Sequence, residues 1–212
     1  MELIFFTLII LIFSIVVHEV AHGYAAYVLG DPTAKYQGRL TLNPLSHIDP
    51  MGSVLIPGLL VISGAGFLFG WAKPVPYNPY NLRNQRWGEA FVAAAGGLTN
   101  LFIALVFAGV VRLASAGVFP ESFMPLAAII VFVNLFLGLF NLLPIPPLDG
   151  WTVLRSLLPY RFALPLQKVE SRVQALGPVA LLIFIAIFLF VLAAPFYLLI
   201  MKLFTALTGT MF

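Results

Sequence analysis

The sequence contains no cysteine and few charged residues. Only 9% of its 212 residues are charged, whereas 61% are hydrophobic; a soluble domain is about half apolar and about a quarter charged. Without cysteine there is no disulfide and no thiolate ligand, so a metal site must use histidine and carboxylate ligands. A net charge of +3 is too small for a nucleic-acid partner. The composition predicts an integral membrane protein whose solvent is the lipid bilayer.

Four apolar runs are each long enough to cross a bilayer core of about 30 Å. They cover residues 3–29, 88–111, 125–150 and 176–207. The fourth run contains Pro195, so it is either one long kinked helix or a span followed by a membrane-associated tail. We therefore expect an all-α polytopic protein with about four transmembrane helices, within a range of four to six. No long polar stretch marks a second module, and a single domain over residues 1–212 is expected.

Residues 31–87 differ from these apolar runs in composition, because they are rich in Pro, Gly and Asn. Residues 36–42 and 71–77 are predicted as short strands, the second limited to a sheet edge by its prolines. Between them, residues 51–63 are apolar but would make only about 20 Å of helix, which is too short to span. We expect a small re-entrant β-hairpin and half-helix here.

The placement of lysine and arginine favours the re-entrant interpretation. With the N-terminus outside and residues 51–69 not crossing, the basic residues of the inner side are Lys35, Arg39, Lys73, Arg83, Arg86, Arg155, Arg161, Lys168 and Arg172. Only Arg112 and Lys202 then lie outside. Because cytoplasmic loops are enriched in lysine and arginine, this arrangement is preferred. Residues 151–175 are predicted to be a basic loop on the inner side.

Three ionisable residues, His18, Glu19 and His22, lie inside the first apolar run. Two histidines four apart share one helix face and can bind one ion, while Glu19 is placed to contact a water on that ion. Ionisable groups at membrane depth are costly unless paired or metal-bound. A polar helix–helix contact or a proton path is the alternative. His18 lies roughly 22 Å from the outer end of the helix, nearer the inner face.

A catalytic zinc usually has three protein ligands and an open position for water, so a third ligand is needed. Asp149 is a candidate because it follows a span whose end is interrupted by three prolines. Such irregular backbone is tolerated at membrane depth only beside protein or a water-filled cavity. An ordinary turn aspartate before glycine is the alternative, and the spacing leaves both interpretations open.

Two motifs, HEVAHGYAA and NLLPIPPLDG, resemble the site-2 protease family of intramembrane metalloproteases. The runs GRLTLNPLSHIDPMGS and FGWAKPVPYNPYNLRN also resemble its compact bacterial members, and nothing resembles a PDZ module. The likeness extends to about Leu158. It implies that His18, His22 and Asp149 bind one zinc ion and that Glu19 is the catalytic base. It further implies cleavage in or near a substrate's transmembrane segment, in the cytoplasmic membrane of a bacterium or archaeon.

Two positions depart from the family pattern. The family's third motif usually reads Ala-Gly-Pro-x-x-Asn, and here Gly97 replaces the proline. This change concerns the local helix geometry rather than the chemistry. Trp151 stands where a small residue is common, and its bulk would narrow the entrance or shape substrate choice.

Four further polar residues are candidates for supporting roles. Asn141 and Asn100 either donate to the oxyanion or hold a substrate backbone, or else form an interhelical hydrogen bond. His47 and Asp49 either serve as a fourth metal ligand, or accept a hydrogen bond from a ligating imidazole, or cap the following half-helix. The cap is favoured, with Asp49 as N-cap and Pro50 at the first helical position.

The sequence leaves two other functions open. One is a membrane protein that binds or transports metal without hydrolysis, although internal repeats typical of transporters are not evident. The other is an inactive protease relative, although all four core residues are present. For a protease, an unwound substrate would need partners for its backbone, and strand addition to residues 36–42 or 71–77 is one hypothesis. Nothing in the sequence indicates an oligomeric state.

Overall fold

A computed structural model describes residues 2–64 and 70–210 of the chain. In this part, four helical segments are long and apolar enough to cross a membrane. They are Glu2–Val28 (α1), Trp87–Ser115 within α4 (Gln85–Ser115), Phe123–Asn141 (α5) and Leu182–Thr208. The expected all-α class and the number of spans are confirmed. Phe5 on α1 is 63% exposed, as expected for a side chain that faces lipid.

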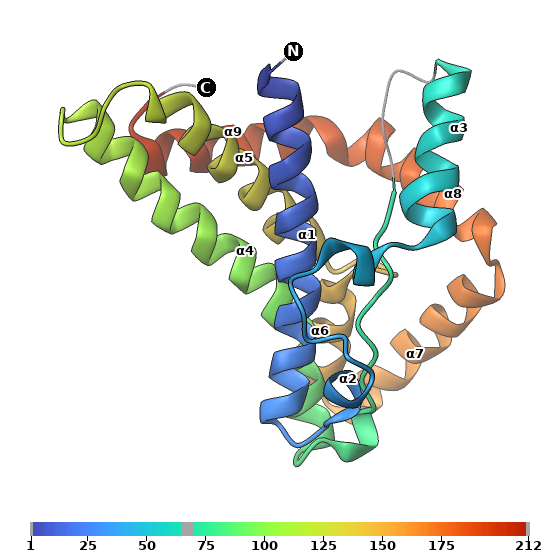
Figure 1. Ribbon diagram of the computed structural model, residues 1–212. Coiled ribbons are helices and arrows are strands. Elements are labelled where there is room, and N and C mark those ends of the chain that lie inside the picture. Colours follow the sequence, from blue (N-terminus) through green and yellow to red (C-terminus); the bar gives the residue numbers. More distant parts are fainter. Residues whose placement is uncertain (1, 65–69, 211–212) are drawn as a thin grey trace.

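Helices α4, α5 and α9 (Ala193–Thr208) share an apolar core. Ala104, Ala108, Val131, Ile200 and Phe204 are each at most 1% exposed. The alanines of α4 let the larger side chains of α9 pack closely against it. Helix α1 packs against α4 and α5, and Figure 1 shows it running upright beside them. The segment of α1 that carries His18 and His22 therefore lies beside two other spans.

The backbones of α4 and α5 touch at two glycines. A Cβ on Gly138 would lie 2.9 Å from the carbonyl oxygen of Gly97, and one on Gly97 would lie 3.2 Å from that of Gly138. Small residues permit such close approach between membrane helices. The contact lies one turn from Asn100 and from Asn141, so it fixes the relative height of these two amides.

The C-terminal apolar run forms one interrupted helix. It consists of α8 (Pro178–Ile187), a π-helical turn (Phe188–Leu192) and α9. Pro195 has no backbone N–H, so the carbonyl four residues earlier loses its donor and the helix widens just before it. The kinked-helix alternative therefore holds, in place of a span with a separate tail.

The two predicted strands do not form in the described part of the chain. Residues 36–42 contain the end of the short helix α2 (Thr33–Tyr36) and a turn, and residues 71–77 run extended without a partner strand. Pro74 and Pro76 lack N–H groups, so this edge cannot supply the regular donors of a β-ladder. The predicted β-hairpin is therefore absent from the described residues.

The predicted half-helix is present as a π-helical turn (Pro50–Leu55) followed by α3 (Ile56–Ser63). Together they are shorter than a membrane span, and Figure 1 shows α3 standing apart from α1. Residues 65–69, at the end of the predicted re-entrant segment, lie outside the described residues. Short 3-10 turns at Pro44–His47 and Pro79–Asn81 complete the region.

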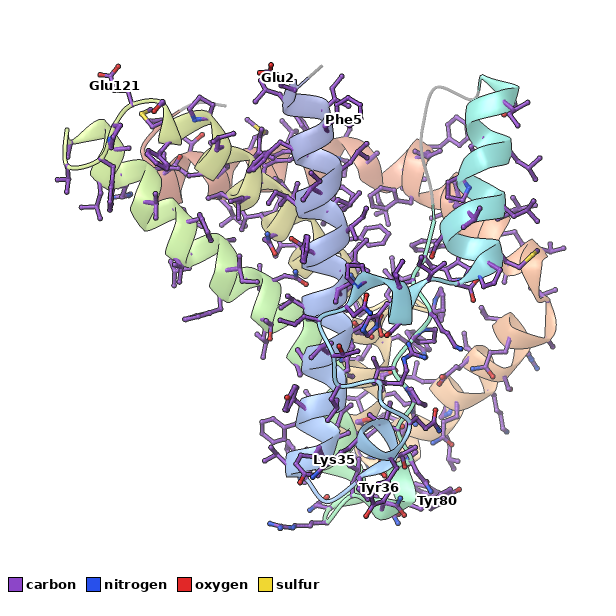
Figure 2. The ribbon with its side chains drawn as sticks, viewed as in Figure 1. Glu2, Phe5, Lys35, Tyr36, Tyr80 and Glu121 are labelled. Carbon is purple, nitrogen blue, oxygen red and sulfur yellow. The ribbon has the colours of Figure 1, made fainter. Side chains whose placement is uncertain are left out.

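The predicted basic loop forms two helices instead, α6 (Asp149–Leu157) and α7 (Tyr160–Ala175). Helix α6 packs against α4 and buries Trp151 and Ser156, whereas α7 contacts α6 and buries only Ala163. Arg155 on α6 joins them to the bundle, with its guanidinium 2.8 Å from Glu89 of α4 and 3.2 Å from Glu170 of α7. Figure 2 shows Glu2 and Glu121 at one end of the molecule and Lys35 at the other.

Candidate metal centre

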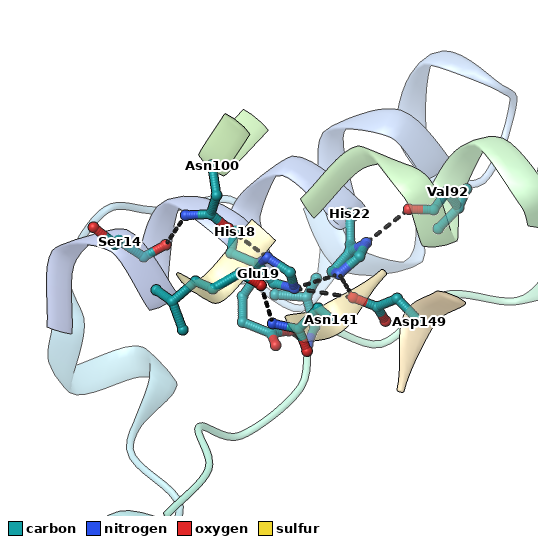
Figure 3. A network of polar contacts seen from close by, with 10 residues as sticks. Ser14, His18, Glu19, His22, Val92, Asn100, Asn141 and Asp149 are labelled. Atoms are coloured by element: carbon teal, nitrogen blue, oxygen red, sulfur yellow. Dashed lines mark hydrogen bonds and ion pairs between the residues drawn. The ribbon is translucent and has the colours of Figure 1, made fainter. Parts of the chain in front are cut away.

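Three ligand atoms from distant parts of the chain converge beside α1. The Nε2 atoms of His18 and His22 are 3.0 Å apart. Asp149 Oδ2 lies 3.0 Å from His18 Nε2 and 3.2 Å from His22 Nε2. Figure 3 shows the three side chains pointing at one another. Within the described ranges, this is the one group of three or more His, Cys, Asp or Glu residues close enough to share a metal.

The arrangement fits a zinc ion. Zinc binds histidine nitrogen and carboxylate oxygen at about 2.0–2.2 Å in tetrahedral geometry, which places neighbouring ligand atoms about 3.3 Å apart. The observed separations of 3.0–3.2 Å are close to that value. Two imidazoles and one carboxylate also leave a fourth position for water or substrate, as catalytic zinc sites do.

Each histidine is held by a hydrogen bond at its other ring nitrogen. His22 Nδ1–H donates to the carbonyl oxygen of Val92 at 2.7 Å, and His18 Nδ1–H donates to Asn100 Oδ1 at 2.7 Å. A carbonyl oxygen only accepts, so the proton resides on Nδ1 in both rings. The lone pair of each Nε2 is therefore free to bind a metal. Such outer contacts orient the ligands and raise their basicity.

Asn100 is fully buried and is itself held by two other spans. Its amide donates to the carbonyl of Ser14 at 3.2 Å and to Asn134 Oδ1 at 2.8 Å. Both amide hydrogens are thus used, and the structure places Asn100 behind His18 rather than facing a substrate. Sequence analysis did not identify Asn134 or Ser14 as part of this network. Asn134 could have been identified, because it is an amide side chain in the middle of the third apolar run.

Gly96 lies directly against the imidazole rings of His18 and His22. A Cβ at this position would be 2.6 Å from His18 Nε2 and 2.5 Å from His22 Nε2. Any side chain there would displace one of the two imidazoles, so α4 can approach this cluster only at a glycine. The neighbouring Gly97, which replaces the family's proline, contacts α5, and α4 runs as a continuous helix through it.

Asp149 is the first residue of α6, where the chain turns back from the end of α5. A Cβ on Gly150 would overlap the backbone of Leu142, so only glycine lets this turn close against α5. The turn brings the carboxylate under α1, although Asp149 and His18 are 131 residues apart in sequence. Trp151 is buried, at 9% exposed, so its bulk packs within the fold.

Glu19 stands beside the cluster without joining it. Its Oε2 accepts a hydrogen bond from the backbone N–H of Val75 at 2.9 Å. A carboxylate next to the three ligand atoms, but not among them, suits a proton acceptor for water at the open position. The Val75 contact involves a backbone group, and no sequence pattern pointed to it.

The remaining candidates occupy other places. Asn141 ends α5, and its Nδ2 donates to the carbonyl of Leu137 at 3.0 Å. His47 is outside the cluster, and its Nε2–H donates to the carbonyl of Thr41 at 2.9 Å. Asp49 accepts from the backbone N–H groups of Met51 and Gly52, at 3.0 and 2.7 Å, which is an N-cap with Pro50 at the first helical position.

Comparison with known proteins gives a consistent set of similarities. Residues 107–185, which include Asp149, match the profile of peptidase family M50. The chain is 40% identical to "Putative zinc metalloprotease YwhC" of Bacillus subtilis over 172 residues, which cover 78% of this chain and 75% of that protein. It is 33% identical to "Putative zinc metalloprotease Rip2" of Mycolicibacterium smegmatis over 142 residues, or 66% of this chain and 52% of the relative. No solved structure matches.

Proposed function

Since this chain belongs to peptidase family M50 and is an intramembrane zinc metalloprotease, we propose that His18, His22 and Asp149 hold its single zinc ion. The observation that carries this proposal is the convergence of two Nε2 atoms and one carboxylate oxygen within 3.0–3.2 Å. Family membership does not favour a metal transporter or an inactive relative.

Glu19 is the proposed catalytic base. Zinc, when bound, acidifies water and polarises the scissile carbonyl. The Glu19 carboxylate accepts the proton of the attacking water and then donates it to the leaving amine, which needs one group with both roles. The hydrogen bonds from Nδ1 of His18 and His22 hold a proton on Nδ1 and orient each ring so that Nε2 points at the metal position.

Asn141 is the proposed donor to the oxyanion of the tetrahedral intermediate. It ends α5 close to the turn that carries Asp149, and one of its amide hydrogens goes to Leu137. Asn100 is a weaker candidate for this role, because both of its amide hydrogens are used by Ser14 and Asn134. Its contact with His18 supports a role in holding the ligand instead.

The proposed substrates are membrane proteins cleaved in or near a transmembrane segment. A membrane helix hides its peptide bonds, so it must unwind locally before a carbonyl can reach the site. Segments weakened by glycine or proline should therefore be preferred. Strand addition to residues 71–77 is not favoured, because Pro74 and Pro76 lack donors and the N–H groups of Trp71 and Lys73 already bond to Gly52 and His47.

The proposed topology has the N-terminus outside and the active site toward the cytoplasmic face of a bacterial or archaeal membrane. The grouping of basic residues supports it, as do the positions of Glu2 and Glu121 at the end opposite Lys35. The natural absence of cysteine makes a direct test simple. In intact cells, a membrane-impermeant maleimide should label Glu121→Cys and spare Lys168→Cys; the reverse pattern would contradict the topology.

The experiment that tests the function uses purified full-length protein and tagged single-span test substrates. Glu19→Gln should keep about one zinc per chain and lose cleavage about 10²–10⁴-fold, because proton transfer is removed while the ligands stay. Glu121→Gln is the matched control, since it makes the same chemical change at an exposed site. A Glu19→Gln enzyme that still cuts at the normal rate would overturn the assignment.

A further inference from the structure

The extended residues 71–78, here called the strap, pass along the face of α1 that carries Glu19. The backbone N–H of Val75 donates to Glu19 Oε2 at 2.9 Å. One oxygen of the proposed catalytic base is thus bound by a backbone group 56 residues away in sequence. A charged acceptor makes such a hydrogen bond stronger than a neutral one.

The side chain of Val75 fits onto α1 one turn beyond Glu19. A Cβ on Gly23 would lie 2.8 Å from Val75 Cγ1 and 2.6 Å from Leu40 Cδ2, so only glycine leaves space for this contact. Val75 is 6% exposed. Its amide therefore points at Glu19 while its methyl groups pack at Gly23, and both contacts fix the same residue of the strap.

Arg39 holds the strap immediately before Val75. Its Nη2 donates to the carbonyl oxygens of Lys73, at 2.8 Å, and of Pro74, at 3.3 Å. The side chain is deeply buried, with the residue 8% exposed. A buried guanidinium is costly without acceptors, so these two carbonyls are its main compensation. The backbone N–H of Lys73 also donates to the carbonyl of His47 at 2.9 Å.

We propose that Arg39 is a positioning residue that acts on Glu19 through the strap. By binding the two carbonyls before Val75, Arg39 keeps the Val75 amide on Glu19 Oε2. A glutamate has several rotamers, and this bond selects one, leaving the other carboxylate oxygen for the proton of water. Pro74 and Pro76 fix φ on both sides of Val75, so the strap holds its shape once Arg39 is bound. The inference rests on the proposed function of Glu19.

Hydrogen exchange tests the first half of this proposal without any substrate. In Arg39→Gln, amides of the strap should exchange at least about tenfold faster, because loss of the anchor lowers the local opening free energy. Exchange in α1, α4 and α5 should be unchanged, and zinc content should remain that of wild type. Lys35→Gln removes the same charge at an exposed position and should change nothing. Unchanged strap exchange in Arg39→Gln would overturn the proposal.

Kinetics with the tagged single-span substrates test the second half. Arg39→Gln should lower kcat about 100-fold with KM within about two-fold, the result expected when a catalytic group is misplaced by about 1 Å while substrate binding is kept. Arg39→Lys should recover part of kcat, because lysine can donate to one carbonyl at a time. A rise in KM with unchanged kcat would contradict a positioning role.

Val75 provides an independent pair of variants. Val75→Pro removes the N–H that binds Glu19 and should lower kcat as Arg39→Gln does, while Val75→Ala keeps the N–H and should retain most of kcat. Equal activity of the two variants would overturn the role of the amide. A wild-type protein that cleaves no substrate would contradict the proposed function instead, and hydrogen exchange would still decide whether Arg39 holds the strap.

Discussion

The Nδ1 atom of His18 and the Oδ1 atom of Asn100 lie 2.7 Å apart, and both residues are buried. Asn100 in turn donates to Asn134 of α5 and to the backbone of Ser14 on α1. Three spans therefore fix the orientation of one imidazole. Metal affinity should depend on residues that do not touch the metal, because contacts behind a ligand set its direction and basicity.

Replacing Asn100 by leucine should weaken zinc binding about 10–100-fold, since the imidazole of His18 loses its partner at Nδ1. The affinity can be measured by competition with a zinc chelator in detergent. Leu98→Ala, at an exposed position on the same helix, is the control and should bind zinc normally. Wild-type affinity in Asn100→Leu would show that the hydrogen bond has no part in the site.

Gly96→Ala should abolish or strongly reduce zinc binding. Its methyl group would lie about 2.6 Å from the ring nitrogens of His18 and His22, so one ligand or the helix must move. Gly109→Ala is the matched control on α4, because a Cβ there meets nothing within 4 Å. Zinc content and thermal stability should be measured together. Full zinc occupancy in Gly96→Ala would contradict the close packing of α4 on the ligands.

Arg155→Met should destabilise the protein by about 1–3 kcal/mol, less than for a fully buried pair because Glu89 and Glu170 are 19% and 27% exposed. Removing the arginine leaves both carboxylates without their cation. Zinc affinity should also fall, since α6 carries Asp149. Lys168→Met on α7 is the control and should change neither the stability nor the zinc affinity. Thermal unfolding with and without zinc would measure both effects.

Acid should destabilise the turn after α1 through Asp31, which is fully buried. Burial alone would raise the pKa of Asp31, but hydrogen bonds from Thr33, Asn81 and Asn78 outweigh it and lower the pKa below 3.8. A carboxyl with a lowered folded pKa stabilises the protein fully above its unfolded pKa, and this stability is lost as pH falls through the folded pKa.

Between roughly pH 5 and pH 2, the Tm of wild type should therefore fall more steeply than that of Asp31→Asn. At neutral pH, Asp31→Asn should be less stable by about 1–3 kcal/mol, because charged acceptors bind buried donors more strongly than neutral ones. Glu121→Gln is the exposed control. Parallel acid profiles of wild type and Asp31→Asn would contradict a role for this carboxylate.

Sequence reasoning succeeded where the physical signal is local and periodic. The four spans are long apolar runs, and His18 and His22 lie together because they are one helical turn apart, so neither inference needs a distant contact. It failed where hydrogen-bond partners decide the structure. Residues 71–77 have strand-like composition but no partner strand, and residues 151–175 are polar yet form two helices, of which α6 packs against α4.

The supporting residues of the site were the hardest to anticipate. Gly96 has no side chain that could bind or react, and its importance follows only from the packing of α4 against two imidazoles. The groups contributed by Val92 and Val75 are a backbone carbonyl and a backbone amide, which every residue type except proline at the amide could supply. Backbone contacts of this kind leave no signature in residue identity.

The sequence by itself determined that the protein lies in a lipid bilayer, that any metal in it must be bound without cysteine, and that His18 and His22 share one helix face. The length of an apolar run and the period of a helix depend only on residues that are close in sequence, so they are the same in any fold that contains the helix. The tertiary structure alone decided that Asp149 meets His18 across 131 residues, that Asn100 lies behind the ligand, and that the strap touches Glu19. These contacts depend on how helices pack, and packing is set by the whole chain.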